Sequence, residues 1–130
     1  MSTLDAVTIQ SQADETPPVF KDAEGSREIV QGAWAWVHFD GGGTVAIQES
    51  FNVSSITDNG TGDYSVNFAT ALPTSTYACL MSTGDSSGQR QVSRLTGTYS
   101  ASVMRMYTHY VIDGALQDAT YVGMAAFCNP

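Results

Sequence analysis

Residues 54–68 read SSITDNGTGDYSVNF, and this stretch decides the class of fold. Its last five residues alternate, which places Tyr64, Val66 and Phe68 on one face of a strand and polar side chains on the other. The six residues at 58–63, DNGTGD, are small, polar and tolerant of positive φ, as a chain reversal requires. The stretch is therefore predicted to form a β-hairpin.

Runs of the same kind follow one another from residue 29 onward. The predicted strands lie at 33–39, 44–53, 54–57, 63–69, 76–83, 90–96, 101–110 and 119–128. Turn residues separate them, including the glycine run at 41–43 and the polar segment at 84–88. Short strands at such close intervals favour a sandwich or barrel over parallel βαβ units. We therefore expect an all-β protein, an antiparallel β-sandwich or jelly-roll-like single domain.

The composition agrees with one all-β domain and disfavours several classes of partner. The 130 residues are 42% hydrophobic and 14% charged, which is enough for one core. A formal net charge of -8 disfavours nucleic acid and anionic membrane surfaces as partners. No apolar run is long enough to span a membrane, and residues 1–15 lack the basic start and apolar centre of a signal peptide. We expect synthesis and folding in a cytosol.

The first 28 residues differ from the rest and are expected to form an extended N-terminal arm. Segment 1–28 is acidic, contains a proline pair and shows little periodicity. A short apolar alternation at Leu4, Val7 and Ile9 could add one strand to another protein, as an anchor does. A frayed terminus explains the same pattern equally well. The expected β-sandwich domain is 29–130.

No arrangement typical of catalysis or of metal binding occurs in the sequence. The two histidines, His38 and His109, lack the short spacings of metal ligands, and no nucleophile elbow is present. The glycine run at 41–43 lacks the lysine and the helix of a phosphate-binding loop. The turn at 58–63 lacks the oxygen spacing of a calcium loop. We expect a protein that is not an enzyme and that needs no cofactor or metal.

The two cysteines, Cys79 and Cys128, have two explanations. They could form a bridge between neighbouring strands, or they could be small buried apolar residues. A reducing compartment favours the second explanation. Nothing in their spacing indicates a metal site.

A set of polar and aromatic residues near predicted loops and strand ends is the candidate glycan-binding patch. It consists of Asp85, Ser86, Ser87, Arg90, Tyr107, His109 and Tyr110. Aromatic rings offer stacking surfaces to sugars, and the Asp, Ser and Arg side chains supply hydrogen bonds. The competing interpretation is that these residues are ordinary solvated strand ends.

A second candidate surface is apolar and is expected to contact other subunits. In the strand at 119–128, Tyr121 and Phe127 share one face, and the opposite face is apolar as well. A small domain with strands covered on both faces often has a partner subunit over one of them. The predicted interface residues are Trp34, Trp36, Tyr121 and Phe127, and burial of Val37 and Phe39 among copies is expected to add to it.

Residues 35–39 read AWVHF, a glycine-rich turn follows, and residues 51–64 read FNVSSITDNGTGDY. With the rest of segment 33–78, these residues resemble a recurrent module of tailed-bacteriophage virion proteins of the tail-fibre or receptor-binding type. The match over 51–64 has no gap, but His38 stands where that module is expected to have a small amide. Residues 79–130 resemble such proteins only in general character.

The resemblance implies a non-enzymatic virion component, assembled in the host bacterial cytoplasm. Such a protein is usually a homotrimer whose N-terminal arm, here with Leu4, Val7 and Ile9, docks to other virion proteins. Its β-domain is then displayed at the tip of a fibre or appendage for attachment to host-surface glycan. The alternative is a capsid or collar decoration protein that binds only virion proteins. A depolymerase would need paired carboxylates in a groove, which this sequence does not indicate.

Overall fold

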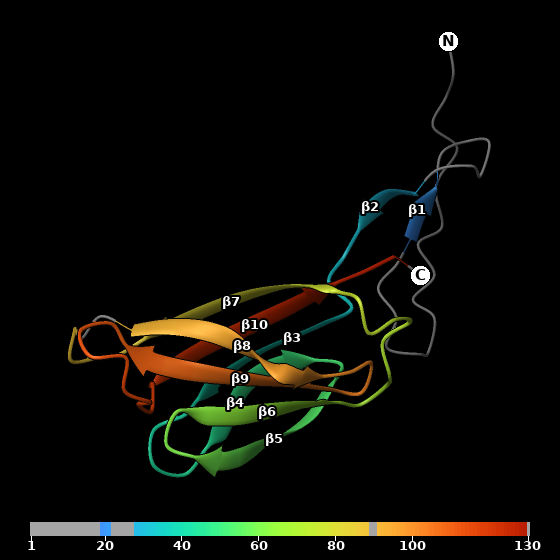
Figure 1. Ribbon diagram of the computed structural model, residues 1–130. Helices are drawn as coiled ribbons and strands as arrows, with labels where there is room; N and C mark the ends of the chain where they lie inside the picture. Colours follow the sequence, from blue (N-terminus) through green and yellow to red (C-terminus); the bar gives the residue numbers. More distant parts are fainter. Residues whose placement is uncertain (1–18, 22–27, 89–90, 130) are drawn as a thin grey trace.

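The computed structural model describes residues 19–21, 28–88 and 91–129, and the regular structure in these residues is all β-strand (Figure 1). Two short strands, β1 (Val19–Lys21) and β2 (Glu28–Gln31), form an antiparallel hairpin that is a sheet of its own. The other eight strands form two four-stranded sheets in which every pairing is antiparallel. No helix in the described residues is long and apolar enough to cross a membrane.

The first sheet has the strand order β4-β3-β10-β7, and the second sheet has the order β5-β6-β9-β8. The strands of the first sheet are β3 (Ala35–Asp40), β4 (Ala46–Phe51), β7 (Ala78–Gly84) and β10 (Tyr121–Phe127). The strands of the second sheet are β5 (Val53–Gly60), β6 (Asp63–Phe68), β8 (Gln91–Tyr99) and β9 (Val103–Tyr110). Buried side chains of both sheets meet in one core, so the two layers form a sandwich (Figure 1). The predicted all-β sandwich is confirmed.

The hairpin predicted from residues 54–68 is present as β5 and β6, but its turn is tighter than expected. The sequence predicts a reversal over all six residues 58–63. In the structure β5 continues to Gly60 and β6 begins at Asp63, so that only two residues lie between the strands. The polar residues before Gly60 therefore belong to a strand, because ladder hydrogen bonds satisfy their backbone better than a loop would.

The chain passes from the first sheet to the second at Asn52, between β4 and β5. Asn52 has φ 54°, and it is the only non-glycine residue with positive φ in the described part of the chain. Its buried Nδ2 donates to the carbonyls of Trp34 and Thr70, both at 3.0 Å, and its Oδ1 accepts from the Thr70 amide at 2.7 Å. The strand predicted at 44–53 therefore ends earlier, at Phe51.

The core is built from alternate residues of the central strands. The inward residues of β6 and β10 are Tyr64, Val66, Phe68, Val122, Met124 and Ala126. The alternation predicted for both strands is thus confirmed. Phe39 of β3 meets Tyr64 edge to face across the two layers, with ring centroids 5.2 Å apart. Each large apolar side chain buried in this way contributes about 1.5–3 kcal/mol to folding.

Tyr64 also carries a polar group into the core. Its hydroxyl lies 3.0 Å from the Gly41 carbonyl and 3.0 Å from Asp118 Oδ1, and the same carboxylate oxygen accepts a hydrogen bond from the Gly62 amide at 2.7 Å. Burial and the nearby carboxylate raise the pKa of Tyr64 above its usual value. These contacts attach the β5–β6 turn to the loop that precedes β10.

Both cysteines are free thiols, so they do not form a bridge. Cys128 is buried, and the half-buried Cys79 places its Sγ 3.1 Å from Met104 Sδ. Burial raises the pKa of the Cys79 thiol to about 11 and also raises the pKa of Cys128. Protonated thiols are poor nucleophiles, so both residues act as small apolar side chains, as the sequence favours.

The expected boundary of the arm falls within the β1–β2 hairpin, because β2 begins at Glu28. The expected anchor residues Leu4, Val7 and Ile9 lie outside the described residues.

Candidate functional site

The outer face of the second sheet carries the strongest cluster of polar and aromatic side chains. Strand β9 turns Met104, Met106 and Thr108 into the core, where each is fully buried. Because side chains alternate along a strand, Arg105, Tyr107 and His109 point to the opposite, solvent-facing side. We call the surface around Tyr107 the Tyr107 face; it includes Asp63, Arg94, Arg105, Tyr107 and His109.

Tyr107 lies at the centre of this face. Its neighbour across the β8–β9 pairing is Arg94, whose guanidinium carbon is 5.3 Å from the Tyr107 ring centroid. The guanidinium carbon of Arg105 is 5.8 Å from the same centroid, and the His109 ring meets Tyr107 edge to face at 5.9 Å. Two guanidinium groups at these distances interact with the negative face of the tyrosine ring, which helps to hold them in place.

Asp63 of β6 is opposite Tyr107 in the β6–β9 pairing and forms an ion pair with Arg105. Arg105 Nε donates to Asp63 Oδ1 at 2.8 Å, and Nη2 donates to Oδ2 at 2.6 Å. Asn59 Nδ2 adds a longer contact to Oδ1 at 3.4 Å. The hydrogen bond from Arg105 is the main reason why the pKa of Asp63 is lowered, so the carboxylate stays ionised and fixed.

A network of amides and hydroxyls continues the polar face over β5 and β6. Asn59 Nδ2 donates to Ser65 Oγ at 2.8 Å. Asn67 Nδ2 donates to Ser55 Oγ at 3.1 Å and to Thr57 Oγ1 at 2.9 Å. These side chains hold one another in fixed orientations, which lowers the entropy lost when a ligand orders them.

His109 is oriented by the loop that follows β9. Its Nδ1 lies 2.9 Å from the Gly114 carbonyl, and because a carbonyl only accepts, Nδ1 carries the proton. Its Nε2 is buried and has no hydrogen-bond partner in the described structure. The histidine ring is held nearly perpendicular to the Tyr107 ring, and its main chain is bridged to Leu116.

The predicted glycan patch is only partly assembled on this face. Tyr107 and His109 lie together, whereas Tyr110 follows Thr108 in the inward parity and pairs with Gln91 at the end of the strand. Arg90 lies outside the described residues.

The remaining members of the patch, Asp85, Ser86 and Ser87, occupy the turn after β7. The Ser87 amide donates to Asp85 Oδ1 at 2.5 Å, and this bond is the main cause of the lowered pKa of Asp85. The Ser86 amide donates to Thr120 Oγ1 at 3.2 Å, just before β10. The hydrogen bonds of this turn therefore attach it to the first sheet, and the expected joint patch is split between two places.

Three members of the Tyr107 face, namely Asp63, Arg94 and Arg105, are not in the predicted patch. The alternation of Arg105 with Tyr107 and His109 along β9 is a signal that was visible in the sequence. The other two residues join the face only through the register of β6 and β8 against β9, and a linear pattern does not give that register.

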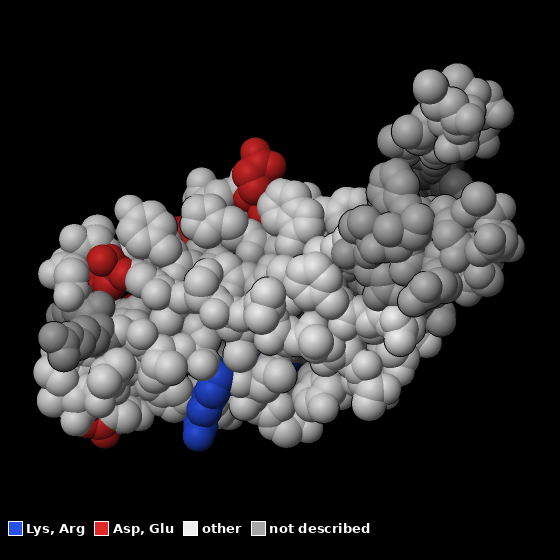
Figure 2. Space-filling view, turned by 90° about the horizontal axis from the view of Figure 1, so that it is seen from above, with Lys and Arg blue, Asp and Glu red and all other residues white. Residues whose placement is uncertain are grey.

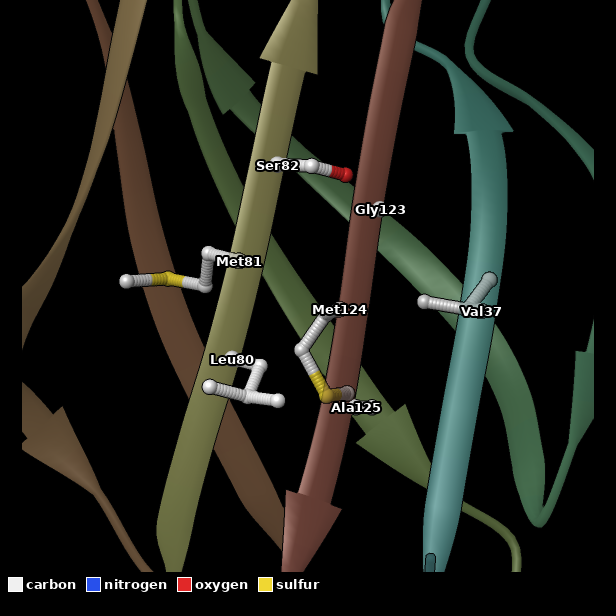
Figure 3. Close-up of a pocket in the computed structure, with 7 residues that line it drawn as sticks. All are labelled: Val37, Leu80, Met81, Ser82, Gly123, Met124 and Ala125. Atoms are coloured by element: carbon white, nitrogen blue, oxygen red, sulfur yellow. The ribbon is translucent and has the colours of Figure 1, made fainter.

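The outer face of the first sheet is apolar over β3, β10 and β7, whereas the edge strand β4 adds the exposed Glu49 opposite His38. Tyr121, Leu80 and Trp36 are exposed to 53%, 67% and 38%, and His38 stacks on Tyr121 with ring centroids 6.3 Å apart. The small side chains at Gly123 and Ala125 leave a shallow depression between β7 and β3, and Figure 3 shows Ser82 reaching from β7 toward Gly123. The depression is lined by Val37, Leu80, Met81, Ser82, Gly123, Met124 and Ala125.

The predicted interface residues divide between this face and the core. Trp36 and Tyr121 lie exposed on the outer face, and the half-buried Phe127 shares the parity of Tyr121 along β10. Trp34 does not belong to this face: it is 7% exposed, and its Nε1 donates to the Cys128 carbonyl at 2.8 Å. The chain bends before β3 begins at Ala35, so the parity of the strand does not extend back to Trp34.

Val37 and Phe39, which were expected to gain burial among copies, are instead core residues of a single chain, 2% and 0% exposed.

No family model, no curated protein and no solved structure matches the chain. The resemblance of residues 33–78 to virion modules therefore stays an expectation.

Proposed function

We propose that this protein is a non-enzymatic virion component of a tailed bacteriophage, a tail-fibre or appendage-tip protein that attaches to host-surface glycan through the Tyr107 face. The observation that carries the binding proposal is one half-buried, outward-facing aromatic ring, Tyr107, flanked by Arg94, Arg105 and His109. The virion part of the proposal rests on the resemblance of residues 33–78, which fits a displayed β-domain.

The chemistry of the Tyr107 face suits a sugar. A sugar presents apolar C–H patches and a rim of hydroxyl groups, so its binding sites combine flat side chains with many hydrogen-bonding groups. Here the tyrosine ring and the adjoining guanidinium groups supply a flat platform. The ionised Asp63 accepts, and the network from Ser55 to Asn67 both donates and accepts. An open sheet face also admits a polysaccharide chain of any length.

The proposal includes a homotrimer formed through the outer face of the first sheet, with a second copy of this chain as the occupant. Copies of a chain with a net charge of -8 repel one another, and this repulsion is weakest where they meet through uncharged surfaces. The outward residues of β3, β7 and β10 include no Asp, Glu, Lys or Arg between Trp36 and His38, Leu80 and Ser82, or Tyr121 and Phe127. The exposed Glu49 of the edge strand β4 borders this uncharged area opposite His38. Apolar side chains on such a face gain from burial between copies.

The two outer faces thus have separate roles. Figure 2 looks onto the edge of the sandwich formed by β7 and β8, where most of the visible surface is uncharged, basic atoms project from one side and acidic atoms project from the opposite side. Association through the first sheet leaves the Tyr107 face of every copy free. Several weak sugar contacts then act together, because each later contact is intramolecular. The residues Leu4, Val7 and Ile9 are the proposed anchor to other virion proteins.

Adsorption of the purified protein to whole bacteria tests this function. Labelled protein is mixed with a panel of strains before and after periodate oxidation of their surface sugars. We expect adsorption to at least one strain, loss of adsorption after periodate, and loss in a Tyr107→Ala variant. Tyr110→Ala is the matched control, because Tyr110 lies on the same strand but outside the Tyr107 face.

The same experiment identifies the main alternative. A capsid or collar decoration protein would bind phage particles that lack this protein and would ignore bacterial cells. The apolar face around Leu80 and Trp36 would then contact another virion protein instead of a second copy. Adsorption that survives periodate would also contradict the glycan proposal.

A further inference from the structure

We infer that the sugar bound at the Tyr107 face is acidic, and that Arg94 holds its carboxylate. This inference rests on the proposed glycan-binding function and names the class of its ligand.

The distribution of positive charge is the first observation. The chain has five Lys and Arg residues against thirteen Asp and Glu residues. The basic residues whose side chains the structure describes are Arg94 and Arg105, and both lie against the same tyrosine ring. An acidic protein whose described cations lie at one half-buried, outward-facing ring has a local preference for anions there, in spite of its overall charge.

The two arginines differ in how many of their N–H donors are already paired with a carboxylate. Arg105 is committed, because both oxygens of Asp63 accept its hydrogen bonds. That pair is the one ion pair within the described part of the chain, so Arg94 has no carboxylate partner there. Arg94 is exposed, and its guanidinium carbon lies over the Tyr107 ring, 5.3 Å from the centroid, a contact that takes up no N–H group in a hydrogen bond to a carboxylate. Its N–H edges stay available.

A free guanidinium edge selects a carboxylate for geometric reasons. Two parallel N–H groups match the two oxygens of a carboxylate, and the charged hydrogen bonds are roughly twice as strong as neutral ones. The Tyr107 ring holds the guanidinium plane, so less side-chain freedom is lost on binding than for an isolated surface arginine. A neutral sugar would leave this charge unused.

The rest of the face explains why the ligand is a sugar acid and not a small free anion. Asp63 lies opposite Tyr107 on β6, and Asn59 and Ser65 extend the hydrogen-bonding surface outward from Asp63. The hydrogen bonds of Asn67 lie farther along β6, where Asn67 pairs with Val103. A uronic acid brings its own hydroxyl groups to these positions, whereas a small anion would leave them hydrated. The ionised Asp63 also repels an anion placed directly over it, which directs the carboxylate toward Arg94.

Matched oligosaccharides test the inference. Uronate oligosaccharides built from glucuronate, galacturonate or mannuronate are each compared with the same molecule after its carboxylates have been reduced to hydroxymethyl groups. Binding to the full-length protein is measured by titration calorimetry. We expect at least one uronate probe to bind about tenfold more tightly than its reduced form, the difference that a charge-assisted bidentate pair supplies.

Substitutions at Arg94 assign the effect to this residue. Arg94→Gln is expected to lower affinity for the uronate to that for the reduced probe and to leave affinity for the reduced probe unchanged. Arg94→Lys is expected to keep only part of the preference, because an ammonium group does not form the bidentate pair. Arg94 is exposed, so thermal unfolding of both variants serves as the control for folding.

The outcomes separate this inference from the function beneath it. Equal affinity for a uronate and its reduced form would overturn the inference while leaving glycan binding intact. A preference that persists in Arg94→Gln would also overturn it, because the carboxylate would then be held elsewhere. Failure of every probe to bind, charged or reduced, together with adsorption to cells, would refute the acidic ligand. The same failure without adsorption would count against both proposals.

Discussion

Arg105 and Asp63 are joined by two hydrogen bonds across β9 and β6, with Nε 2.8 Å from Oδ1 and Nη2 2.6 Å from Oδ2. The side chains are 33% and 12% exposed, so the pair lies between the solvent and the sheet. It fixes the carboxylate at the start of β6 directly beside Tyr107. This one pair therefore shapes both the stability of the hairpin end and the charge of the Tyr107 face.

The pair predicts how stability depends on pH. Because Arg105 lowers the pKa of Asp63 in the folded state, the ion pair stabilises the protein above the unfolded pKa of the carboxyl group. This contribution is lost as the pH falls through the lower, folded pKa. In urea unfolding, we expect wild type to exceed Asp63→Asn by a constant amount from about pH 5 to 7, and the difference to shrink below about pH 4. A difference that grows in acid would contradict this assignment.

Asn52 is predicted to be the most sensitive asparagine of the described chain. Asn52→Ala removes three hydrogen bonds of a buried side chain and places an alanine at φ 54°, so we expect a loss of about 2–4 kcal/mol in the free energy of unfolding. Asn52→Gly should cost less, because glycine accepts this φ. Asn67→Ala is the control, since its hydrogen bonds are exposed, and should cost less than about 1 kcal/mol. Equal losses for Asn52 and Asn67 would refute the special role of the crossover.

Alanine substitutions of the two tryptophans are predicted to have different effects. Trp34→Ala empties a core position and removes the bond to the Cys128 carbonyl, so it should destabilise the fold by about 3–5 kcal/mol. Trp36→Ala should change the unfolding free energy little but lower self-association, as measured by sedimentation velocity. A Trp36→Ala protein that sediments like wild type would place the assembly surface elsewhere.

Two glycines with nearly the same φ allow the cost of backbone strain to be measured separately from the cost of a steric clash. Gly62 has φ 64°, and a Cβ there would lie 2.6 Å from the Thr108 carbonyl oxygen; Gly43 has φ 65° and open space around it. Gly43→Ala should cost about 1–2 kcal/mol for the left-handed conformation alone. Gly62→Ala should lower the free energy of unfolding by about 1–3 kcal/mol more than Gly43→Ala, because backbone atoms near the new Cβ must move. Thermal unfolding of the two variants measures the difference. Equal losses of stability would show that the loop before β10 can move away from the new Cβ at no cost.

The strands could be predicted from the sequence because their faces differ so clearly in polarity. Tyr64, Val66 and Phe68 face the core as their alternation indicates, and β10 presents its two faces as expected. The crossover at Asn52 could not be predicted, because its left-handed conformation depends on carbonyls of Trp34 and Thr70 that are distant in sequence. The side chain of an asparagine does not indicate in advance which carbonyls will meet it.

The candidate site was only partly predictable for a related reason. The sequence places Tyr107 and His109 in one patch because both lie near the end of a predicted strand. Arg94 became their neighbour through the pairing of β8 with β9, and a shift of one residue would have turned it into the core. The Asp85 turn was assigned to the same patch from loop proximity alone, and its bond to Thr120 attaches it to the other sheet.

Strand β9 places a core residue and a solvent-facing residue in turn, with Met104 and Met106 inside and Arg105 and Tyr107 outside. Mutations at the outward positions other than Arg105, which is paired with Asp63, leave the volume between the sheets unchanged, so they carry little risk for folding. If the Tyr107 face is the attachment site that we propose, a lineage under pressure from changing hosts can diversify what it adheres to one side chain at a time. Its descendants should keep the methionines long after Tyr107 and Arg94 have been exchanged.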